Sequence, residues 1–264
     1  MKLGQKAGIT LVLSGGTARG LAHIGILEVL EENNIPIKRI VAVSAGSLVG
    51  GIYAAGKLND LKKEVFNLKS KMNILSNLSF RLDNRGLFDI KNFEVPVKKL
   101  IDDIKIENLS VGFVSLAYDV VNNRRFIFQN GELYNAIRAS MSIPGLFPPF
   151  KYKKSVLIDG AFSDSLPADI ARDLFPRDKI VAINLELGSK FNSRHFSLLN
   201  LLNYSINLQL KEMARSNEHK ADLVIKPLIK EGKWDFKHMQ KIIDEGRMAA
   251  EKALPKIKRL LQSD

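Results

Sequence analysis

The sequence contains no cysteine, one tryptophan and only four histidines among its 264 residues. The absence of cysteine excludes a disulfide framework, a thiolate metal site and a cysteine nucleophile. No apolar run is long enough to cross a bilayer, and residues 1–8 lack the apolar stretch of a signal peptide. We therefore expect a cytoplasmic protein.

The charge is strongly unbalanced, with 40 basic against 28 acidic residues and a formal net charge of +12. Such an excess favours anionic partners, although it is also typical of a lysine-rich solvated surface. Arginines do not cluster with aromatic residues, and no nucleic-acid-binding motif is present. We expect no nucleic acid partner and a peripheral contact with an anionic membrane surface; oligomeric state is left open.

The order of apolar segments predicts an α/β fold. Residues 9–13 and 39–43 are apolar runs typical of buried strands, and each precedes a helical pattern, at about 21–33 and 47–55. This order predicts a βαβ crossover and a parallel sheet. The lack of repeats and linkers predicts a single domain over residues 1–264. We expect further strands at about 110–118, 125–129, 155–158, 180–185 and 222–226, and helices at about 132–140, 166–174, 197–214 and 238–262, the last interrupted by Pro255.

A different pattern begins at Leu58, where apolar residues recur every three or four positions as far as Leu75. This spacing predicts a helix with one apolar face. The helix either packs on the sheet or forms part of a mobile cap, at about residues 57–80, beside an active site.

Ser44 is the candidate nucleophile. It directly follows the 39–43 strand and is flanked two residues away by Ala42 and Gly46. Small residues at these positions are needed in a strand–turn–helix elbow, because the two backbones approach closely there. The turn also exposes the serine hydroxyl at the start of a helix, whose dipole favours developing negative charge. A buried strand followed by an ordinary helix is the competing interpretation.

The loop after the first strand, Ser14 to Gly20, is rich in glycine. It lacks the spacing of a dinucleotide-binding fingerprint and the Gly-Lys-Ser/Thr of a phosphate-binding P-loop. Adjacent Gly15 and Gly16 can instead form a nest of backbone N–H groups suited to an oxyanion. Since parallel strands end at one edge of a sheet, the loop and Ser44 are expected to lie together.

Ser44 needs a base, and Asp159 is the best candidate. It ends a short apolar strand and is followed by Gly160 and Ala161. Asp-Gly is also a common turn. The histidines are weaker candidates, because His23 lies within a predicted helix and the others lie in polar segments. The alternatives, listed together, are His23, His195, His219 and His238, with Asp164 and Asp119 as further acids.

Taken together, these motifs resemble the patatin-like phospholipases. The resemblance rests on residues 14–20, Ser44 and Asp159-Gly160-Ala161 in that order, and it extends over nearly the whole chain. Further matching segments are Gly86-Leu87-Phe88, residues 139–149, residues 221–225 and Asp244-Glu245-Gly246.

The resemblance implies a three-layer α/β/α fold and hydrolysis of lipid acyl esters by a serine–aspartate dyad, with no metal or cofactor. It makes Ser44 the nucleophile and Asp159 the base. It places the oxyanion hole at the N–H groups of Gly15, Gly16 and Thr17. Arg19 matches a basic position that supports this loop or contacts an anionic headgroup.

Two residues depart from the family pattern. Thr17 stands where a third glycine is usual, and Ala42 replaces the first glycine of the elbow. A β-branched residue with positive φ at position 17 would be strained, which would tilt one donor of the oxyanion hole. At position 42 a methyl group is expected to fit.

Four apolar residues in a proline-punctuated segment form the candidate acyl channel: Ile143, Leu146, Phe147 and Phe150. A lipid tail must leave water to reach Ser44, and these residues precede the Asp159 strand. Packing in the core is the competing interpretation.

Two other functions use the same features. A thioesterase or acyltransferase would form the same acyl-enzyme with a different leaving group or acceptor. A non-catalytic lipid- or protein-binding regulator would keep the fold without the reaction. Thr17, the basic surface and the apolar helix around Leu198–Leu210 fit that alternative, and this helix is equally compatible with an oligomer contact. The presence of both Ser44 and Asp159 favours an enzyme.

Overall fold

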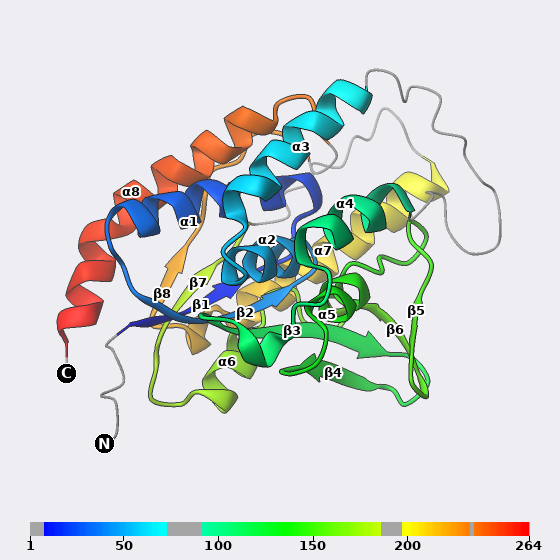
Figure 1. The fold of residues 1–264 in the computed structure, drawn as a ribbon, viewed down its shortest axis with the longest axis horizontal. Coiled ribbons are helices and arrows are strands. Elements are labelled where there is room, and N and C mark those ends of the chain that lie inside the picture. The colour runs from blue at the N-terminus through cyan, green and yellow to red at the C-terminus, as the bar shows by residue number, and fades with distance from the viewer. Residues whose placement is uncertain (1–7, 73–90, 186–196, 233–234, 264) are drawn as a thin grey trace.

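The computed structural model describes residues 8–72, 91–185, 197–232 and 235–263. Within these residues an eight-stranded mixed sheet lies between two layers of helices (Figure 1). The strand order is β5-β6-β3-β2-β1-β7-β8, and β4 pairs separately with β3. The strands are β1 (Ile9–Leu13), β2 (Ile37–Val43), β3 (Gly112–Asp119), β4 (Arg124–Phe128), β5 (Phe150–Tyr152), β6 (Ser155–Asp159), β7 (Lys179–Ile183) and β8 (Leu223–Ile225).

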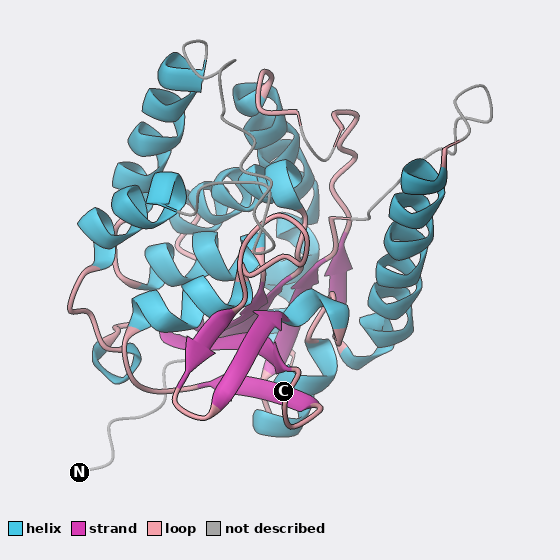
Figure 2. Cartoon of the chain, turned by 90° about the vertical axis from the view of Figure 1, so that its right-hand side faces the viewer, coloured by secondary structure: helices cyan, strands magenta, loops and turns pink. Residues whose placement is uncertain are grey.

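Helices cover both faces of the sheet. One layer, with the larger buried core, includes α1, α2, α5 and α8; α6 and α7 pack on the opposite face with a second apolar cluster. In Figure 2, α7 is the long helix at the right, apart from the other helices. The helices are α1 (Ala22–Glu32), α2 (Ala45–Ala54), α3 (Leu58–Met72), α4 (Lys91–Ile101), α5 (Leu133–Ser140), α6 (Ala168–Leu174), α7 (Leu198–Asn217) and α8 (Met239–Gln262). The α/β/α fold expected from the sequence is confirmed.

The central strands are parallel, as the βαβ pattern predicts. β1 pairs in parallel with β2 and β7, β2 with β3, and β7 with β8. Every residue of β1 is buried, because both faces of this strand are covered by helices. The expected strands and helices are present, with ends shifted by a few residues.

One edge of β3 is shared by two strands. β2 pairs with residues 112–116 and β6, running antiparallel, with residues 117–119. Since β4 pairs with residues 115–119 and overlaps both, β2 and β6 must lie on the same edge of β3, opposite β4. β2 ends at Val43 opposite Leu116, and β6 ends at Asp159 opposite Ala117. The backbone register therefore brings Ser44 and Asp159 to one point.

Three features differ from the sequence expectations. α4 was not expected and contains Pro96, and the three-residue β5 is too short to give an alternating pattern. The expected interruption at Pro255 is wrong, because α8 continues through it. Pro255 removes the donor for the carbonyl of Glu251, and this residue is exposed, so water can replace that donor. Of the predicted cap, α3 is a helix; residues 73–80 and Gly86-Leu87-Phe88 lie outside the described residues.

Candidate active site

Ser44 lies at a sharp turn between β2 and α2. Its backbone has φ 54° and ψ −126°, a conformation that costs energy for a residue with a side chain. Gly46 allows this turn, because a Cβ there would lie 2.6 Å from the carbonyl oxygens of both Leu13 and Ser14. Ala42 is fully buried in the core, so the methyl group is accommodated as expected.

The hydroxyl of Ser44 donates a hydrogen bond of 2.6 Å to Oδ2 of Asp159. The other carboxyl oxygen, Oδ1, accepts the N–H of Ala161 at 2.8 Å, which fixes the orientation of the carboxyl group. The small residue that follows Asp159 is required by packing, since a Cβ on Gly160 would lie 2.3 Å from the carbonyl oxygen of Leu116. The two residues predicted as nucleophile and base are therefore in direct contact.

The electrostatics of Asp159 suit a proton acceptor. Burial raises the pKa of Asp159 to about 7, and hydrogen bonds from Ser44 and Ala161 oppose this increase only in part. A carboxyl group with a pKa near neutrality is a much stronger base than an ordinary aspartate. This increase in pKa narrows the gap between the carboxyl group and the much less acidic serine hydroxyl.

Ser140, at the end of α5, was missed by the sequence analysis as a site residue. Its hydroxyl accepts the backbone N–H of Ser44 at 2.8 Å and donates to the carbonyl oxygen of Leu116 at 2.7 Å. Ser140 thus links the turn at Ser44 to β3, the strand that pairs with both β2 and β6. No local pattern distinguishes it from other serines, because its partners are 24 and 96 residues away.

The oxyanion loop, residues 15–17, lies directly beside Ser44. A Cβ on Gly15 would lie 3.2 Å from Cβ of Ser44, so only glycine gives this close approach without displacement. The N–H of Gly15 donates to the carbonyl oxygen of Ser165 at 3.2 Å, and it is therefore not free for an oxyanion. Within the described part of the chain, no hydrogen bond occupies the N–H of Gly16 or Thr17.

Thr17 adopts the conformation anticipated as strained. Its φ is 51°, in the left-handed region that a β-branched residue rarely enters. Two residues on, the Arg19 side chain is buried and its Nε donates to the carbonyl oxygen of Glu231 at 2.9 Å. Of the two roles predicted for Arg19, this geometry fits loop support.

His23 is buried and contacts Ser14, at the start of the glycine-rich loop, and not Ser44. Its Nε2 is 3.0 Å from the carbonyl oxygen of Ser14, so this nitrogen carries the proton. Burial lowers the pKa of His23 to about 4, and the ring is neutral at physiological pH. The remaining histidines in the described residues, His219 and His238, are exposed; His195 lies outside them.

Asp119 and Asp164, the alternative acidic candidates for the base, have other partners. Asp119 accepts hydrogen bonds from Ser155, Val121 and Asn122 and stabilises the turn after β3. Asp164 is buried and lies 3.7 Å from a guanidinium nitrogen of Arg125.

The candidate channel residues Ile143, Leu146, Phe147 and Phe150 are all half-buried. Phe150 packs against the main core and lies beneath Arg138, with 5.5 Å between guanidinium carbon and ring centre. Arg138 also donates to the hydroxyl of Ser142 and the carbonyl of Pro148, which anchors this segment beside Asp159. Phe150 thus contacts the core, and the channel stays a prediction for all four residues.

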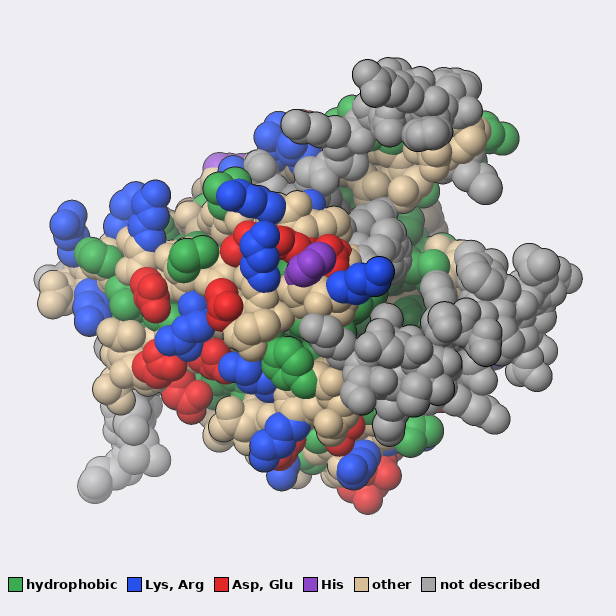
Figure 3. All heavy atoms as spheres, turned by 90° about the horizontal axis from the view of Figure 1, so that it is seen from above, with side chains coloured by type: hydrophobic (Ala, Val, Ile, Leu, Met, Phe, Trp, Pro, Cys, Tyr) green, Lys and Arg blue, Asp and Glu red, His purple; other side chains and the backbone are tan. Residues whose placement is uncertain are grey.

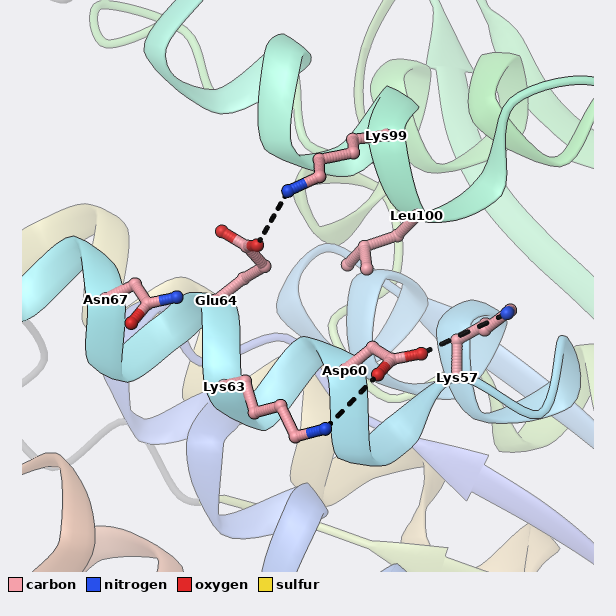
Figure 4. Close-up of a pocket in the computed structure, with 7 residues that line it drawn as sticks. All are labelled: Lys57, Asp60, Lys63, Glu64, Asn67, Lys99 and Leu100. Carbon is pink, nitrogen blue, oxygen red and sulfur yellow. Dashed lines mark hydrogen bonds and ion pairs between the residues drawn. The ribbon is translucent and has the colours of Figure 1, made fainter.

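A separate surface pocket of about 310 Å³ lies between α3 and α4 (Figure 4). Its lysines face acidic partners: Lys57 and Lys63 pair with Asp60, and Lys99 with Glu64. No residue of the candidate site lines it. The pocket therefore does not take part in the chemistry proposed below.

Within the described residues, no group of three histidine or acidic side chains is placed to hold a metal ion. No helix there has the length and apolar character needed to cross a membrane.

The fold and the contact between Ser44 and Asp159 agree with the resemblance found in the sequence. A family model described as patatin-like phospholipase matches residues 11–172, more than half of the chain. The chain belongs to the patatin-like phospholipase family.

Among its relatives is patatin-like phospholipase domain-containing protein 6 of Mus musculus, with 31% identity over 187 residues. That match covers 69% of this chain and 14% of the relative, so the chain spans a small part of that protein's length. An uncharacterized NTE family protein of Mycobacterium tuberculosis has 33% identity over 159 residues, covering 60% of this chain and 44% of the relative. The crystal structure of VipD from Legionella pneumophila aligns with a TM-score of 0.49 and 12% identity, over 97% of this chain and 69% of VipD.

Proposed function

We propose that this protein hydrolyses acyl esters of lipids through Ser44 and Asp159. The observation that carries the proposal is the 2.6 Å hydrogen bond from Ser44 Oγ to Asp159 Oδ2. Membership of the patatin-like phospholipase family supports a lipid substrate.

In the proposed reaction Ser44 Oγ attacks the ester carbonyl carbon, and the hydroxyl proton passes to Asp159 Oδ2. The carbonyl oxygen becomes an oxyanion, which accepts hydrogen bonds from the N–H groups of Gly16 and Thr17. The intermediate collapses to an acyl-enzyme, and the departing alcohol takes the proton from Asp159. Water then attacks the acyl-enzyme in the same way and releases the fatty acid, while Ser44 recovers its proton.

Intact mass after fluorophosphonate treatment tests the activated serine. We expect one adduct on Ser44 in the wild-type protein, none in Ser44→Ala, and strongly slowed labelling in Asp159→Asn. A folded protein that forms no adduct would contradict the proposal and favour a non-catalytic regulator. Parallel assays with an oxygen ester and a thioester of one acyl chain then separate a lipid esterase from a thioesterase.

We further propose that the protein contacts anionic lipid surfaces through α7. Its N-terminal part, residues 198–210, includes no charged residue. Its leucine face, defined as Leu198, Leu201, Leu202 and Ile206, is exposed, with Leu198 at 69% and Leu202 at 51%. On the side seen in Figure 3, basic and acidic side chains are interspersed. The +12 net charge therefore supplies a general attraction, and the leucine face supplies apolar contact.

Sedimentation with vesicles of phosphatidylglycerol and phosphatidylcholine measures this contact. The double variant Leu198→Gln/Leu202→Gln should lose at least half of its vesicle binding, whereas Leu228→Gln should not. Leu228 is a matched control, because it is also highly exposed, at 78%, but lies outside α7. Equal binding by all variants would exclude the leucine face as the contact.

A further inference from the structure

The oxyanion loop has a partner in the last helix of the chain. Gly25 of α1 and Gly246 of α8 bring these helices into backbone contact, since a Cβ on Gly246 would lie 2.1 Å from the carbonyl oxygen of Ala22. A Cβ on Gly25 would lie 2.0 Å from the carbonyl oxygen of Ile243. The position of α8 relative to the start of α1 is therefore fixed. Glu245, adjacent to Gly246, is buried at this junction.

Two acidic residues meet Arg19 there. The carboxyl pair, Glu231 and Glu245, is buried and interacts electrostatically with the buried guanidinium of Arg19. The Arg19 side chain also donates a hydrogen bond to the main-chain carbonyl oxygen of Glu231, 212 residues away in sequence. Lys241 of α8 contributes the second cation, with 2.6 Å between its Nζ and Glu231 Oε1.

The carboxyl pair has the features of two groups that share one proton. Oxygen Oε2 of each residue is buried, and neither accepts a hydrogen bond within the described residues. Burial raises the pKa of Glu245, and the neighbouring carboxylate of Glu231 raises it further. At Glu231 burial is outweighed by the contact with Lys241, and the pKa of this carboxyl group is lowered. One proton shared between the two carboxyl groups would satisfy both orphaned oxygens and leave one negative charge facing Arg19 and Lys241.

The loop needs such support because Thr17 is strained. A non-glycine residue with φ near +50° costs energy and persists only where its surroundings enforce it. Arg19 lies two residues after Thr17, within the same short turn of residues 17–21. Holding Arg19 therefore holds the backbone that carries the Gly16 and Thr17 N–H groups.

We propose that Glu245 is a positioning residue, which acts with Glu231 through Arg19 to hold the oxyanion loop in its donor geometry. This inference rests on the proposed acyl hydrolase function. The C-terminal helix thus completes a site whose proposed reacting groups all lie between Gly16 and Asp159.

The test combines kinetics with amide hydrogen exchange. Glu245→Ala should lower kcat about 10-fold and leave KM within about twofold, because loss of donor geometry affects the transition state more than substrate binding. Exchange in residues 14–21 should become faster in the same variant. Glu245→Gln should recover most of the loss, since its amide donates permanently to Glu231. Asp244→Ala, at an exposed neighbouring position of α8, is the matched control.

Arg19→Ala separates positioning from general weakening of α8. If Glu245 acts through Arg19, adding Glu245→Ala to Arg19→Ala should change kcat by less than twofold. Full additivity of the two losses would overturn the proposal, as would unchanged exchange in residues 14–21 of Glu245→Ala. If the wild-type protein neither forms the fluorophosphonate adduct nor hydrolyses esters, the proposed function fails. The exchange experiment then still decides whether Glu245 holds the loop.

Discussion

The two turns that meet at the candidate site are built in different ways. The turn at Ser44 and the oxyanion loop follow adjacent strands, and each contains one non-glycine residue with positive φ, Ser44 and Thr17. The Ser44 turn is held by the start of its own helix, where Ser47 and Leu48 both donate to the Ser44 carbonyl oxygen, and by Ser140. The oxyanion loop and the residues beside it are held by partners that include Ser165, Leu185 and Glu231, all in the second half of the chain.

This difference indicates which part of the site a short motif can encode. The Ser44 turn carries most of its determinants within a few residues. The oxyanion loop carries the glycines that permit its shape, whereas the groups that select the shape are distant in sequence. Four predictions test this contrast.

The largest expected effect is on the base. Asp159→Asn should lower kcat by about 10³-fold or more, because the amide cannot accept the Ser44 proton. His23→Gln should leave a substantial part of the activity, since His23 contacts the loop and not Ser44. Ester hydrolysis by the two purified variants gives the comparison. The reverse order of activities would make His23 the base.

Asp159→Asn, which should lower activity, should raise the stability of the fold above about pH 7. Because the folded-state pKa of Asp159 is raised to about 7, the folded protein retains a proton between about pH 4 and 7 that the unfolded chain releases. The free energy of unfolding therefore falls as pH rises through this range, whereas activity should rise through about pH 7. Asp159→Asn avoids the buried charge. Denaturant titrations should show it to be more stable than wild type at pH 8, by a few kcal/mol, and nearly equal at pH 4.

A smaller effect is expected at the support of the Ser44 turn. Ser140→Ala removes the acceptor of the Ser44 N–H and the donor to Leu116, and it should destabilise the fold by about 1–3 kcal/mol. Activity should fall about 10-fold as Ser44 moves relative to Asp159. Ser163→Ala is a suitable control, because its hydroxyl bonds only locally, to the Gly160 carbonyl oxygen, among the described residues. Wild-type kinetics in Ser140→Ala would show that the turn needs no support from α5.

The smallest effect is expected at Thr17. Thr17→Gly relieves the strain of positive φ but increases the freedom of the unfolded chain, so stability should change by no more than about 1 kcal/mol. If distant contacts hold the loop, kcat should stay within about threefold of wild type. A gain of 100-fold would instead show that the threonine displaces an oxyanion donor in the native protein.

The contrast between local and distant contacts also explains which residues of the site could be predicted from the sequence. The contact between Ser44 and Asp159 could be predicted, because each residue lies at the end of an apolar strand and is surrounded by small residues. Ser140 and Glu245 could not be assigned a role, since their contacts depend on helices whose relative positions are set by packing. The N–H of Gly15 was expected to be an oxyanion donor, but it bonds to Ser165, in a loop that is distant in sequence. α4 was missed because Pro96 lies within it.

The meeting of β2 and β6 along one edge of β3 also has a practical consequence for engineering. The spacing of Ser44 and Asp159 is set by the hydrogen-bond ladder and not by the 115 residues that separate them in sequence. The exposed turn of residues 120–123 lies at the far end of β3, beyond the segment that pairs with β2. Val120 still belongs to the ladder, because its N–H donates to the carbonyl oxygen of Val156 in β6. A fluorescent reporter or an affinity tag would therefore be inserted after Val120, within residues 121–123. The protein thus offers an internal labelling position that is independent of both chain termini.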